Sequence, residues 1–485
     1  MSTKAAAFDE TFGRFADIVG PDYVLTDPES CALYSQDVYT KKIPAVAVIF
    51  PSDKFQLAEI VGVAVKSNYD VIPRGGGMSY TSGYVPATNN SIIIDLGRMD
   101  QILEINEEDM FVTVECGCTW NKLHDALKDT GLRTPFWGSL SGLMATVGGG
   151  LSQNAIFWGS GQFGTAADSV LGLEVVLADG SILKTGSDAQ VNGSPFFRHF
   201  GPDLTGIFTS DAGAFGFKVT ATLRLIPELN AKSFAAFEFK SPNDMMNAMS
   251  EIGRQGLAME CFGFDPCLQK QRMKRESLSK DVKALASVMR QSDSIVSAIS
   301  DGAKIALAGR GFMEDVDFSL QVMIEDRIEP ASEARLSAVY EICSNHNGKE
   351  LENSVPKLLR ANPFGPLNNM LGPAGERWVP IHAVLPHSKI QSAYEGIDEI
   401  VTRNDRLIES HGILIGHLFA LIANNGFVLE PVFFWPDEIT EIHKKTVESN
   451  HLARLKSFPK NQSARDAVEK LRNEMLELFG QLGAI

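Results

Sequence analysis

The sequence predicts an α+β protein with two large domains and a C-terminal helical segment. The chain has 485 residues, which at roughly 150 residues per domain is enough for two or three domains. Strand and helix patterns alternate up to about residue 227, and the composition changes after that point. We therefore expect one domain over residues 1–227, a second over 228–452, and a helical segment over 453–485 that could return to the first domain.

The composition is that of a globular protein with an acidic surface. Hydrophobic residues make up 44% and charged residues 21%, unlike disordered or collagen-like chains. The formal net charge of −16 disfavours binding to nucleic acid or to anionic lipid. No apolar run approaches the roughly 18 residues that would span a bilayer, and Met1 to Glu10 has no signal-peptide core. The six cysteines fit neither a disulfide framework nor a zinc pattern, so we expect a cytoplasmic protein with reduced thiols.

The first domain begins with a β-α-β unit that leads into a glycine-rich loop. A β-rich run at 45–50 is followed by Ser52 and Asp53, either of which can cap the next helix. A short strand from Val71 then runs into the loop Arg74-Gly75-Gly76-Gly77-Met78-Ser79. The helix between them has a single apolar face, formed by Leu57, Ile60, Val61, Ala64 and Val65.

Two strands, a helix and three more glycine-dense stretches follow. The strands are expected at 92–96 and 111–115, the helix at 119–128, and the glycine-dense stretches at 138–150, 159–164 and 213–216. Between the last two stretches, β-like runs at 171–178 and 181–185 flank Asp179-Gly180. This pattern predicts a β-hairpin, because an Asp-Gly turn supplies positive φ at both central positions.

Four glycine-rich loops near strand ends favour a cofactor that carries phosphate. Glycine lets backbone N–H groups approach a ligand closely and converge on anionic oxygens, although a single loop of this kind is more often an ordinary turn. Gly159-x-Gly161-x-x-Gly164 matches the Rossmann dinucleotide fingerprint in form. That fingerprint must open a helix, with an acidic residue about twenty positions on. A strand-turn-strand follows instead, so we reject the Rossmann fold.

Four ordered motifs resemble the FAD domain of the vanillyl-alcohol oxidase/p-cresol methylhydroxylase superfamily. The motifs are Pro73 to Gly77, Val147-Gly148-Gly149 with Gln153-Asn154-Ala155, Gly172 to Gly180, and Gly206 to Thr209 with Gly213 to Gly216. The loop sequences are also similar to the glycolate oxidase flavoprotein subunit. The resemblance covers about residues 44–227 and implies a two-subdomain FAD-binding domain of the p-cresol methylhydroxylase type, followed by an α+β substrate cap.

The resemblance also implies which residues contact FAD. In this superfamily, main-chain N–H groups of the first glycine loop wrap the pyrophosphate, and the second loop lies along the phosphates and the ribityl chain. The implied FAD-binding residues are Arg74, Gly75, Gly76, Gly77, Met78, Ser79, Gly142, Thr146, Gly148, Gly149, Gly164, Thr165, Ala166, Asp168, Val170, Gly216 and Val219.

Two residues are candidates for catalysis on the same ground. Tyr80 follows the first loop, near the place where a family tyrosine holds a phenolate substrate. His382 lies in a β-like run of the cap, where a family histidine can carry a covalent bond to the flavin. Met78 and Gly142 occupy the two commonest attachment positions and cannot form that bond. We therefore expect non-covalent FAD, with His382 as the alternative attachment point.

The cap is expected to mix helices and strands. Helices are expected at 281–299 and 330–345, and strands at 318–324, 379–385 and 427–435. Aromatic residues are dense near its end and could line a pocket, although core packing is the commoner role; they are Phe419, Phe427, Phe433, Phe434 and Trp435. The paired-histidine motif of related D-2-hydroxy-acid dehydrogenases is missing around His417, so no metal is expected.

The resemblance implies an FAD-dependent oxidase or dehydrogenase that transfers a hydride from a small molecule to flavin N5. The leading substrate class is an aromatic (phenolic or benzylic) alcohol. A 2-hydroxy acid is the rival class, and a buried arginine facing the flavin would favour it. A third hypothesis is a catalytically silent flavoprotein that acts through a partner. It is prompted by the C-terminus, where a helix is expected at 467–479 in place of the family's closing segment. Oxygen or an electron-transfer partner is the expected acceptor, and a homodimer is considered.

Overall fold

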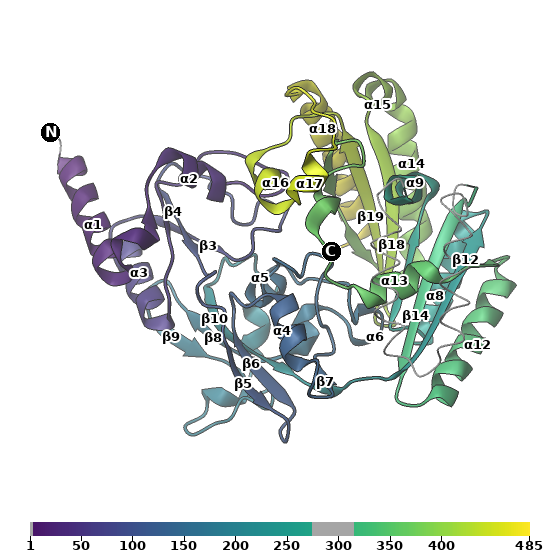
Figure 1. The fold of residues 1–485 in the computed structure, drawn as a ribbon, viewed down its shortest axis with the longest axis horizontal. Coiled ribbons are helices and arrows are strands. Elements are labelled where there is room, and N and C mark those ends of the chain that lie inside the picture. The colour runs from purple at the N-terminus through teal and green to yellow at the C-terminus, as the bar shows by residue number, and fades with distance from the viewer. Residues whose placement is uncertain (1–2, 274–314) are drawn as a thin grey trace. The chain divides into compact units, whose positions relative to one another are not determined.

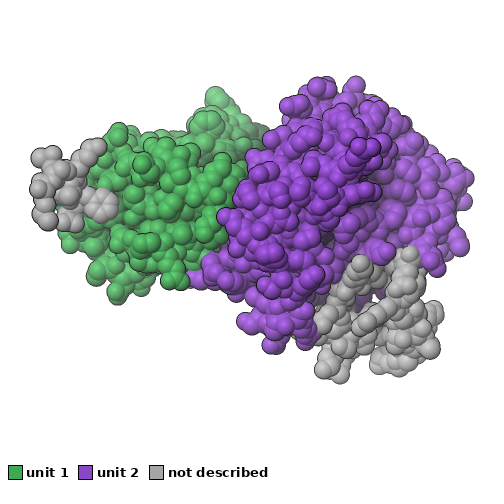
Figure 2. All heavy atoms as spheres, turned by 90° about the horizontal axis from the view of Figure 1, so that it is seen from above, with its two compact units in different colours: residues 1–157, 165–228 green, residues 158–164, 229–485 purple. Residues whose placement is uncertain are grey.

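The computed structural model describes residues 3–273 and 315–485, which divide into two compact units. Unit 1 comprises residues 1–157 and 165–228, and unit 2 comprises 158–164 and 229–485 (Figure 2). The short segment 158–164 therefore belongs to the second unit, as do residues 453–485. The helix expected at 281–299 lies outside the described residues.

The first sheet of unit 1 carries the glycine-rich loop at the end of one strand. Its strand order is β1-β2-β4-β3, with the last three strands parallel. The bounds are β1 Val24–Leu25, β2 Ala47–Ile49, β4 Ser91–Asp95 and β3 Asp70–Arg74. Helices α1 (Thr3–Val19) and α3 (Lys54–Lys66) supply Phe12, Phe15, Leu57 and Ile60 to its core. The predicted cap of α3 is confirmed, because the Asp53 carboxylate accepts the N–H groups of Phe55 and Gln56.

The second sheet of unit 1 is antiparallel, in the order β5-β6-β10-β8-β9. Its strands are β5 Ile102–Asn106, β6 Phe111–Glu115, β10 Phe217–Arg224, β8 Val170–Val176 and β9 Ile182–Lys184. The predicted hairpin at Asp179-Gly180 is confirmed, since β8 pairs with β9. The expected positive φ at both turn residues is wrong, because Gly180 has φ +84 but Asp179 does not have positive φ. A two-stranded pair, β7 (Leu132–Arg133) with β11 (Ile226–Pro227), and helices α2 (Pro28–Tyr34), α4 (Trp120–Leu127), α5 (Val147–Ser152) and α7 (Leu204–Ile207) complete the unit.

Unit 2 is built on an antiparallel sheet, which has eight strands in the described part of the chain. Seven follow the order β15-β12-β14-β13-β18-β19-β16, and β17 also pairs with β19. The bounds are β15 Lys349–Leu351, β12 Ala231–Phe239, β14 Phe318–Asp326, β13 Glu260–Phe264, β18 Leu414–Ile422, β19 Gly426–Trp435, β16 Arg377–Pro380 and β17 Ala383–Leu385. The strand expected at 379–385 is thus interrupted at Ile381 and His382.

Helices cover both faces of this sheet (Figure 1). On one face α8 (Pro242–Arg254), α12 (Glu329–Asn345) and α14 (Ile390–Arg403) pack against side chains such as Phe237 and Phe419. The opposite face carries α9 (Pro266–Met273), whose Leu268 meets Leu418 and Val432. We call this opposite face the α9 face.

The remaining helices of unit 2 are short, apart from α18. They are α6 Ser160–Phe163, α13 Ser354–Ala361, α15 Asp405–His411, α16 Glu441–Thr446, α17 Ser449–Leu452 and α18 Gln462–Leu482. The last of these contains the helix expected at 467–479 and packs against α14 and α15. Among the described residues, no helix is both long and apolar enough to cross a membrane.

Candidate functional site

The carbonyl groups of the first glycine-rich loop are held from within unit 1. Tyr84 donates its hydroxyl to the carbonyl of Gly77 at 2.7 Å, and the Val38 N–H donates to the carbonyl of Ser79 at 3.1 Å. The Arg74 guanidinium donates to the carbonyl of Gly75 at 3.2 Å. Three alternate carbonyls of the loop are therefore fixed by groups that the protein supplies itself.

The amide groups of the same loop are left free. From Gly75 to Ser79, the five consecutive backbone N–H groups donate no hydrogen bond within the described part of the chain. Gly77 adopts φ +70, a conformation that favours glycine. Successive free N–H groups in a turn form a concave anion-binding site. The loop therefore fits the pyrophosphate of FAD, which is the role predicted for residues 74–79.

The side chain of Arg74 is committed inside the protein. It forms an ion pair with the buried Asp95, and its guanidinium lies over the rings of Tyr34 and Tyr84, 4.7 and 5.6 Å from their centroids. Burial acts to lower the pKa of Arg74, but Asp95, together with Tyr84 and Tyr34, outweighs burial, so the pKa of Arg74 is raised. Arg74 thus fixes the loop, and its guanidinium charge is already neutralised by Asp95.

The second glycine-rich loop packs closely against the first. A side chain at Gly76 would overlap the carbonyl oxygen of Met144, and one at Gly75 would overlap the Thr146 hydroxyl. Thr146 caps helix α5 by accepting the N–H of Gly149 at 3.2 Å. The N–H groups of Gly142 and Gly148 donate to the carbonyls of Ser139 and Cys116. This close approach of two backbones explains why both loops consist of glycine and small residues.

The other predicted FAD-binding residues occupy several settings. The Asp168 carboxylate is exposed and accepts from the Thr165 N–H and hydroxyl, at 2.7 and 2.9 Å, so it closes a 3₁₀ turn. Ala166 and Val170 are buried in unit 1, whereas Gly164 belongs to unit 2. Gly216 lies where a Cβ would come within 2.5 Å of Val175. Val219 is a core residue at a register shift of β10.

The two predicted catalytic residues lie in different units. Tyr80 is half-buried in unit 1, just after the free amides. His382 lies in unit 2, between β16 and β17. Burial lowers the pKa of His382, so its imidazole is neutral at pH 7. A neutral imidazole can accept a proton.

The structure brings His382 together with two residues that the sequence did not indicate. His382 Nδ1 lies 3.8 Å from the Glu430 carboxylate of β19. Arg272, near the end of α9, is electrostatically coupled to the same carboxylate. Burial lowers the pKa of Arg272 and raises the pKa of Glu430 to about 7. We call Arg272, His382 and Glu430 the unit 2 charged cluster.

The aromatic-rich stretch of the cap packs the core. Five aromatic residues of this stretch are buried: Phe434 is 3% exposed, and the other four, Phe419, Phe427, Phe433 and Trp435, are 0% exposed. The Trp435 indole donates to the Asp437 carboxylate at 3.1 Å. Core packing, the commoner role for such residues, is therefore what the structure has.

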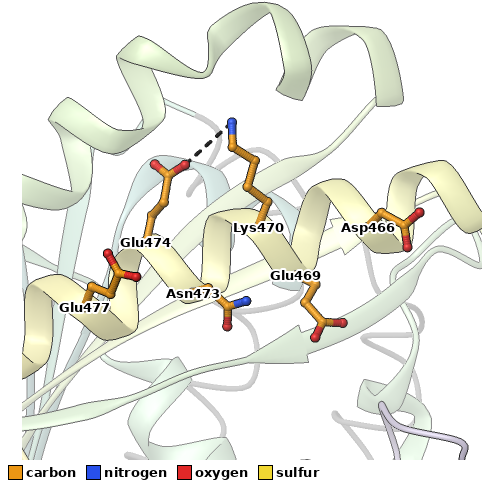
Figure 3. A pocket seen from close by; sticks show the side chains of 6 residues that line it. All are labelled: Asp466, Glu469, Lys470, Asn473, Glu474 and Glu477. Carbon is orange, nitrogen blue, oxygen red and sulfur yellow. Dashed lines mark ion pairs between the residues drawn. The ribbon is translucent and has the colours of Figure 1, made fainter.

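The surface of α18 is separate from the predicted site residues. A shallow acidic surface on α18 is lined by Asp466, Glu469, Lys470, Asn473, Glu474 and Glu477 (Figure 3). Its lysine is already paired with Glu474 at 3.6 Å. Within residues 3–273 and 315–485, no three His, Cys, Asp or Glu side chains are grouped so that they could hold a metal ion.

Comparison with known families agrees with the loop geometry. Residues 45–186 match the family model described as the FAD binding domain. This segment is therefore similar to an FAD binding domain. The match agrees with the resemblance of the glycine-rich loops to an FAD domain, and FAD is the cofactor that such a domain binds.

Curated relatives are similar to this chain over part of their length. A probable mitochondrial D-lactate dehydrogenase of Danio rerio is 31% identical over 269 residues, which are 54% of this chain and 52% of the relative. The glycolate oxidase subunit GlcD of Bacillus subtilis is 29% identical over 206 residues, 42% of each chain. The chain thus spans about half or less of the length of the curated relatives it matches.

Solved structures match over nearly the whole chain, at low sequence identity. A substrate-bound p-cresol methylhydroxylase gives a TM-score of 0.72 at 16% identity, covering 99% of this chain and 88% of the other. A 4-ethylphenol oxidase from Gulosibacter chungangensis also gives 0.72, at 15% identity, covering 100% and 89%. The chain therefore shares the fold of these two proteins, and the predicted fold class is confirmed.

Proposed function

We propose that this protein is an FAD-dependent oxidoreductase that oxidises a 2-hydroxy acid. The observation that carries the cofactor assignment is the row of free N–H groups from Gly75 to Ser79 within the FAD binding domain. The substrate class is supported by the relatives named D-lactate dehydrogenase and glycolate oxidase subunit. A half-buried arginine of unit 2, Arg272, is available as a partner for the carboxylate of such a substrate.

The residues around the free amides would hold FAD. The N–H groups of residues 75–79 would bind the pyrophosphate, and the backbone near Gly142 and Gly148 would support the rest of the cofactor. FAD, when bound, supplies the acceptor for the hydride that leaves the substrate carbon. The protein supplies orientation and a group that takes the hydroxyl proton.

His382 is the proposed acceptor of the hydroxyl proton. Its pKa is lowered by burial, so it is neutral and able to take a proton at pH 7. Its side chain keeps 35% of its surface exposed. Tyr80 remains a second proposed contact, in unit 1.

FAD is proposed to be bound without a covalent link. Among the described residues, the cysteines are free thiols, and burial raises the pKa of Cys116 and Cys118 to about 12. A buried thiol with a raised pKa is a poor nucleophile. Met78 and Gly142 cannot form the bond, so His382 is the one predicted alternative.

An aromatic alcohol is the second candidate substrate. Two half-buried aromatic residues, Phe264 and Trp378, lie on the α9 face of the unit 2 sheet, which also carries Glu430. They could contact an aromatic ring attached to the carbon that is oxidised. A 2-hydroxy acid with an aromatic substituent, such as mandelate, would satisfy both sets of residues.

A substrate panel tests this proposal. The purified flavoprotein is mixed anaerobically with lactate, glycolate and mandelate in both stereochemical forms where these exist, and with benzylic and phenolic alcohols. Loss of the visible flavin absorbance with an acid supports the proposal, and loss with the alcohols alone supports the second candidate. No bleaching by any compound would favour the catalytically silent flavoprotein. Adding oxygen or an artificial acceptor to the bleached protein then identifies the acceptor class.

A further inference from the structure

The register of the unit 2 sheet determines which side chains share the α9 face. Leu418 of β18 pairs with Glu430 of β19, and Gly416 pairs with Val432. Side chains two apart on a strand point to the same face. Leu418 and Val432 contact Leu268 of α9, so Glu430 lies on the face that α9 covers.

Helix geometry brings Arg272 to the same place. Leu268 and Arg272 are four residues apart on α9 and therefore lie on one side of that helix. A Cβ at Gly416 would come within 2.7 Å of the Leu268 nitrogen, which shows how closely α9 lies on the sheet. Arg272 follows one turn later, and Glu430 is the charged group that opposes the effect of burial on its pKa.

His382 reaches Glu430 from the neighbouring edge of the sheet. The Ile381 N–H donates to the carbonyl of Pro431 at 3.0 Å, and Ala383 pairs with Leu429. His382 is therefore held directly beside Glu430, with 3.8 Å between Nδ1 and Oε2. The exposed fractions are 35% for the His382 side chain and 13% for that of Glu430.

The charges in this cluster are incompletely matched. In the described part of the chain, no carboxylate lies within ion-pair distance of the Arg272 guanidinium. Burial raises the pKa of Glu430 to about 7, so at neutral pH this carboxyl is negative only part of the time. A half-buried guanidinium that has no ion pair among the described residues can bind a planar carboxylate through two parallel N–H···O bonds.

We propose that Arg272 binds the carboxylate of the substrate, with Glu430 as the internal group that competes for the guanidinium. This inference rests on the proposed function, because it assigns the acid group of a 2-hydroxy acid to a specific residue. The hydroxyl of the same substrate would then lie near His382, the proposed proton acceptor.

The test is the binding of oxalate to the FAD-loaded protein, measured by isothermal titration calorimetry. Oxalate has one carboxylate like that of a 2-hydroxy acid and a second carboxylate in place of the hydroxyl-bearing carbon. It has no C–H bond and cannot lose a hydride, so the titration measures binding without catalysis. Arg272→Gln is expected to weaken oxalate binding by about 10- to 100-fold, the effect of losing a charge-assisted hydrogen bond. Lys270→Gln is the matched control, because Lys270 is an exposed cation on the same helix.

The outcomes divide clearly. An unchanged Kd in Arg272→Gln, or an equal loss in Lys270→Gln, would overturn the assignment. If Arg272→Gln does not fold with its full FAD content, Arg272→Lys replaces it. An oxalate affinity of Arg272→Lys that is weaker than wild type, but by less than the roughly 10- to 100-fold expected for loss of the charge, supports the assignment. Wild-type Kd in the lysine variant would contradict the two-bond contact. A third outcome is that wild type binds oxalate and Arg272→Gln does not, while no 2-hydroxy acid bleaches the wild-type flavin. This outcome would refute the proposed function and would still support Arg272 as an anion-binding residue.

Discussion

Tyr84 donates its phenolic hydroxyl to the main-chain carbonyl of Gly77 across 2.7 Å, so a residue outside the glycine-rich loop fixes the direction of a peptide inside it. Tyr84 is 7% exposed and also lies against the Arg74 guanidinium. Because the protein holds the carbonyls of Gly75, Gly77 and Ser79, the N–H groups of residues 75–79 stay available for a ligand. The tyrosine and arginine side chains therefore hold the loop in one conformation without occupying its N–H groups.

The first prediction concerns the close approach of the two glycine-rich loops. In Gly76→Ala the new methyl group overlaps the carbonyl oxygen of Met144, so the loop must move. We expect FAD affinity to fall by about 100-fold or more, because at least two charge-assisted hydrogen bonds are lost. Equilibrium dialysis of the protein with FAD measures this change.

Gly13→Ala is the control for that experiment. Gly13 lies in α1 with no atom near its missing side chain, and helix propensity favours alanine there. It should keep wild-type FAD content. Full FAD binding by a folded Gly76→Ala protein would show that the loop does not hold the pyrophosphate.

The second prediction is that the purified protein is yellow and releases its flavin on acid precipitation. Met78 and Gly142 cannot form a covalent bond to the flavin, and Cys116 and Cys118 are buried thiols. Fluorescence of the supernatant and of the redissolved pellet measures the distribution of the flavin. Flavin that stays with the denatured wild type and is released from His382→Ala would instead establish a link through His382.

Much of unit 1 follows from local sequence signals. The Asp53 cap, the apolar face of α3, the loop after β3 and the Asp179-Gly180 hairpin each depend on residues close together in the chain. Strand β5 was not expected, because its residues are mostly exposed or half-buried and Leu103 points to solvent, which hides the alternation typical of strands.

The site could be predicted only in part. The glycines of the first glycine-rich loop are visible in the sequence, but the contacts of Val38 and Tyr84 with that loop depend on tertiary structure. Arg272 and Glu430 are far apart in the chain and show no motif. Their proximity arises because α9 packs across β18 and β19 in one particular register, which local patterns do not encode.

The third prediction concerns the pH dependence of oxalate binding. The pKa of Glu430 is about 7, so above this pH its negative charge competes with oxalate for Arg272. The charged groups that face it are Arg272 from α9 and His382 from the neighbouring connection, and the pKa of His382 is lowered from 6.5. Oxalate affinity should therefore fall as the pH rises through 7, by up to about tenfold per pH unit.

Glu430→Gln should remove this dependence. The amide has no negative charge at any pH in that range, so the Kd of oxalate should stay constant where the wild-type value rises. Calorimetric titrations of both proteins on the two sides of pH 7 measure the difference. Parallel pH profiles would mean that another group controls anion binding.

The fourth prediction concerns Gln321 of β14. It is 0% exposed, and neither atom of its amide has a hydrogen-bond partner among residues 3–273 and 315–485. A buried polar group without a partner costs about 1–3 kcal/mol. Gln321→Met, which keeps a similar shape, should raise the free energy of unfolding by about that amount, measured by denaturant titration.

Gln101→Met, at an exposed position, is the matched control and should change stability by no more than about 0.5 kcal/mol. A less stable Gln321→Met protein would indicate that the amide is satisfied by a ligand that co-purifies.

The most direct test of the account is a single-turnover measurement without oxygen. The FAD-loaded protein is mixed with an excess of the 2-hydroxy acid that bleaches its flavin fastest, and the 2-oxo acid formed is quantified against the FAD reduced. The account predicts one 2-oxo acid per FAD, and slower bleaching when the hydrogen on the hydroxyl-bearing carbon is replaced by deuterium. Bleaching without a 2-oxo acid, or no bleaching by any 2-hydroxy acid, would contradict it.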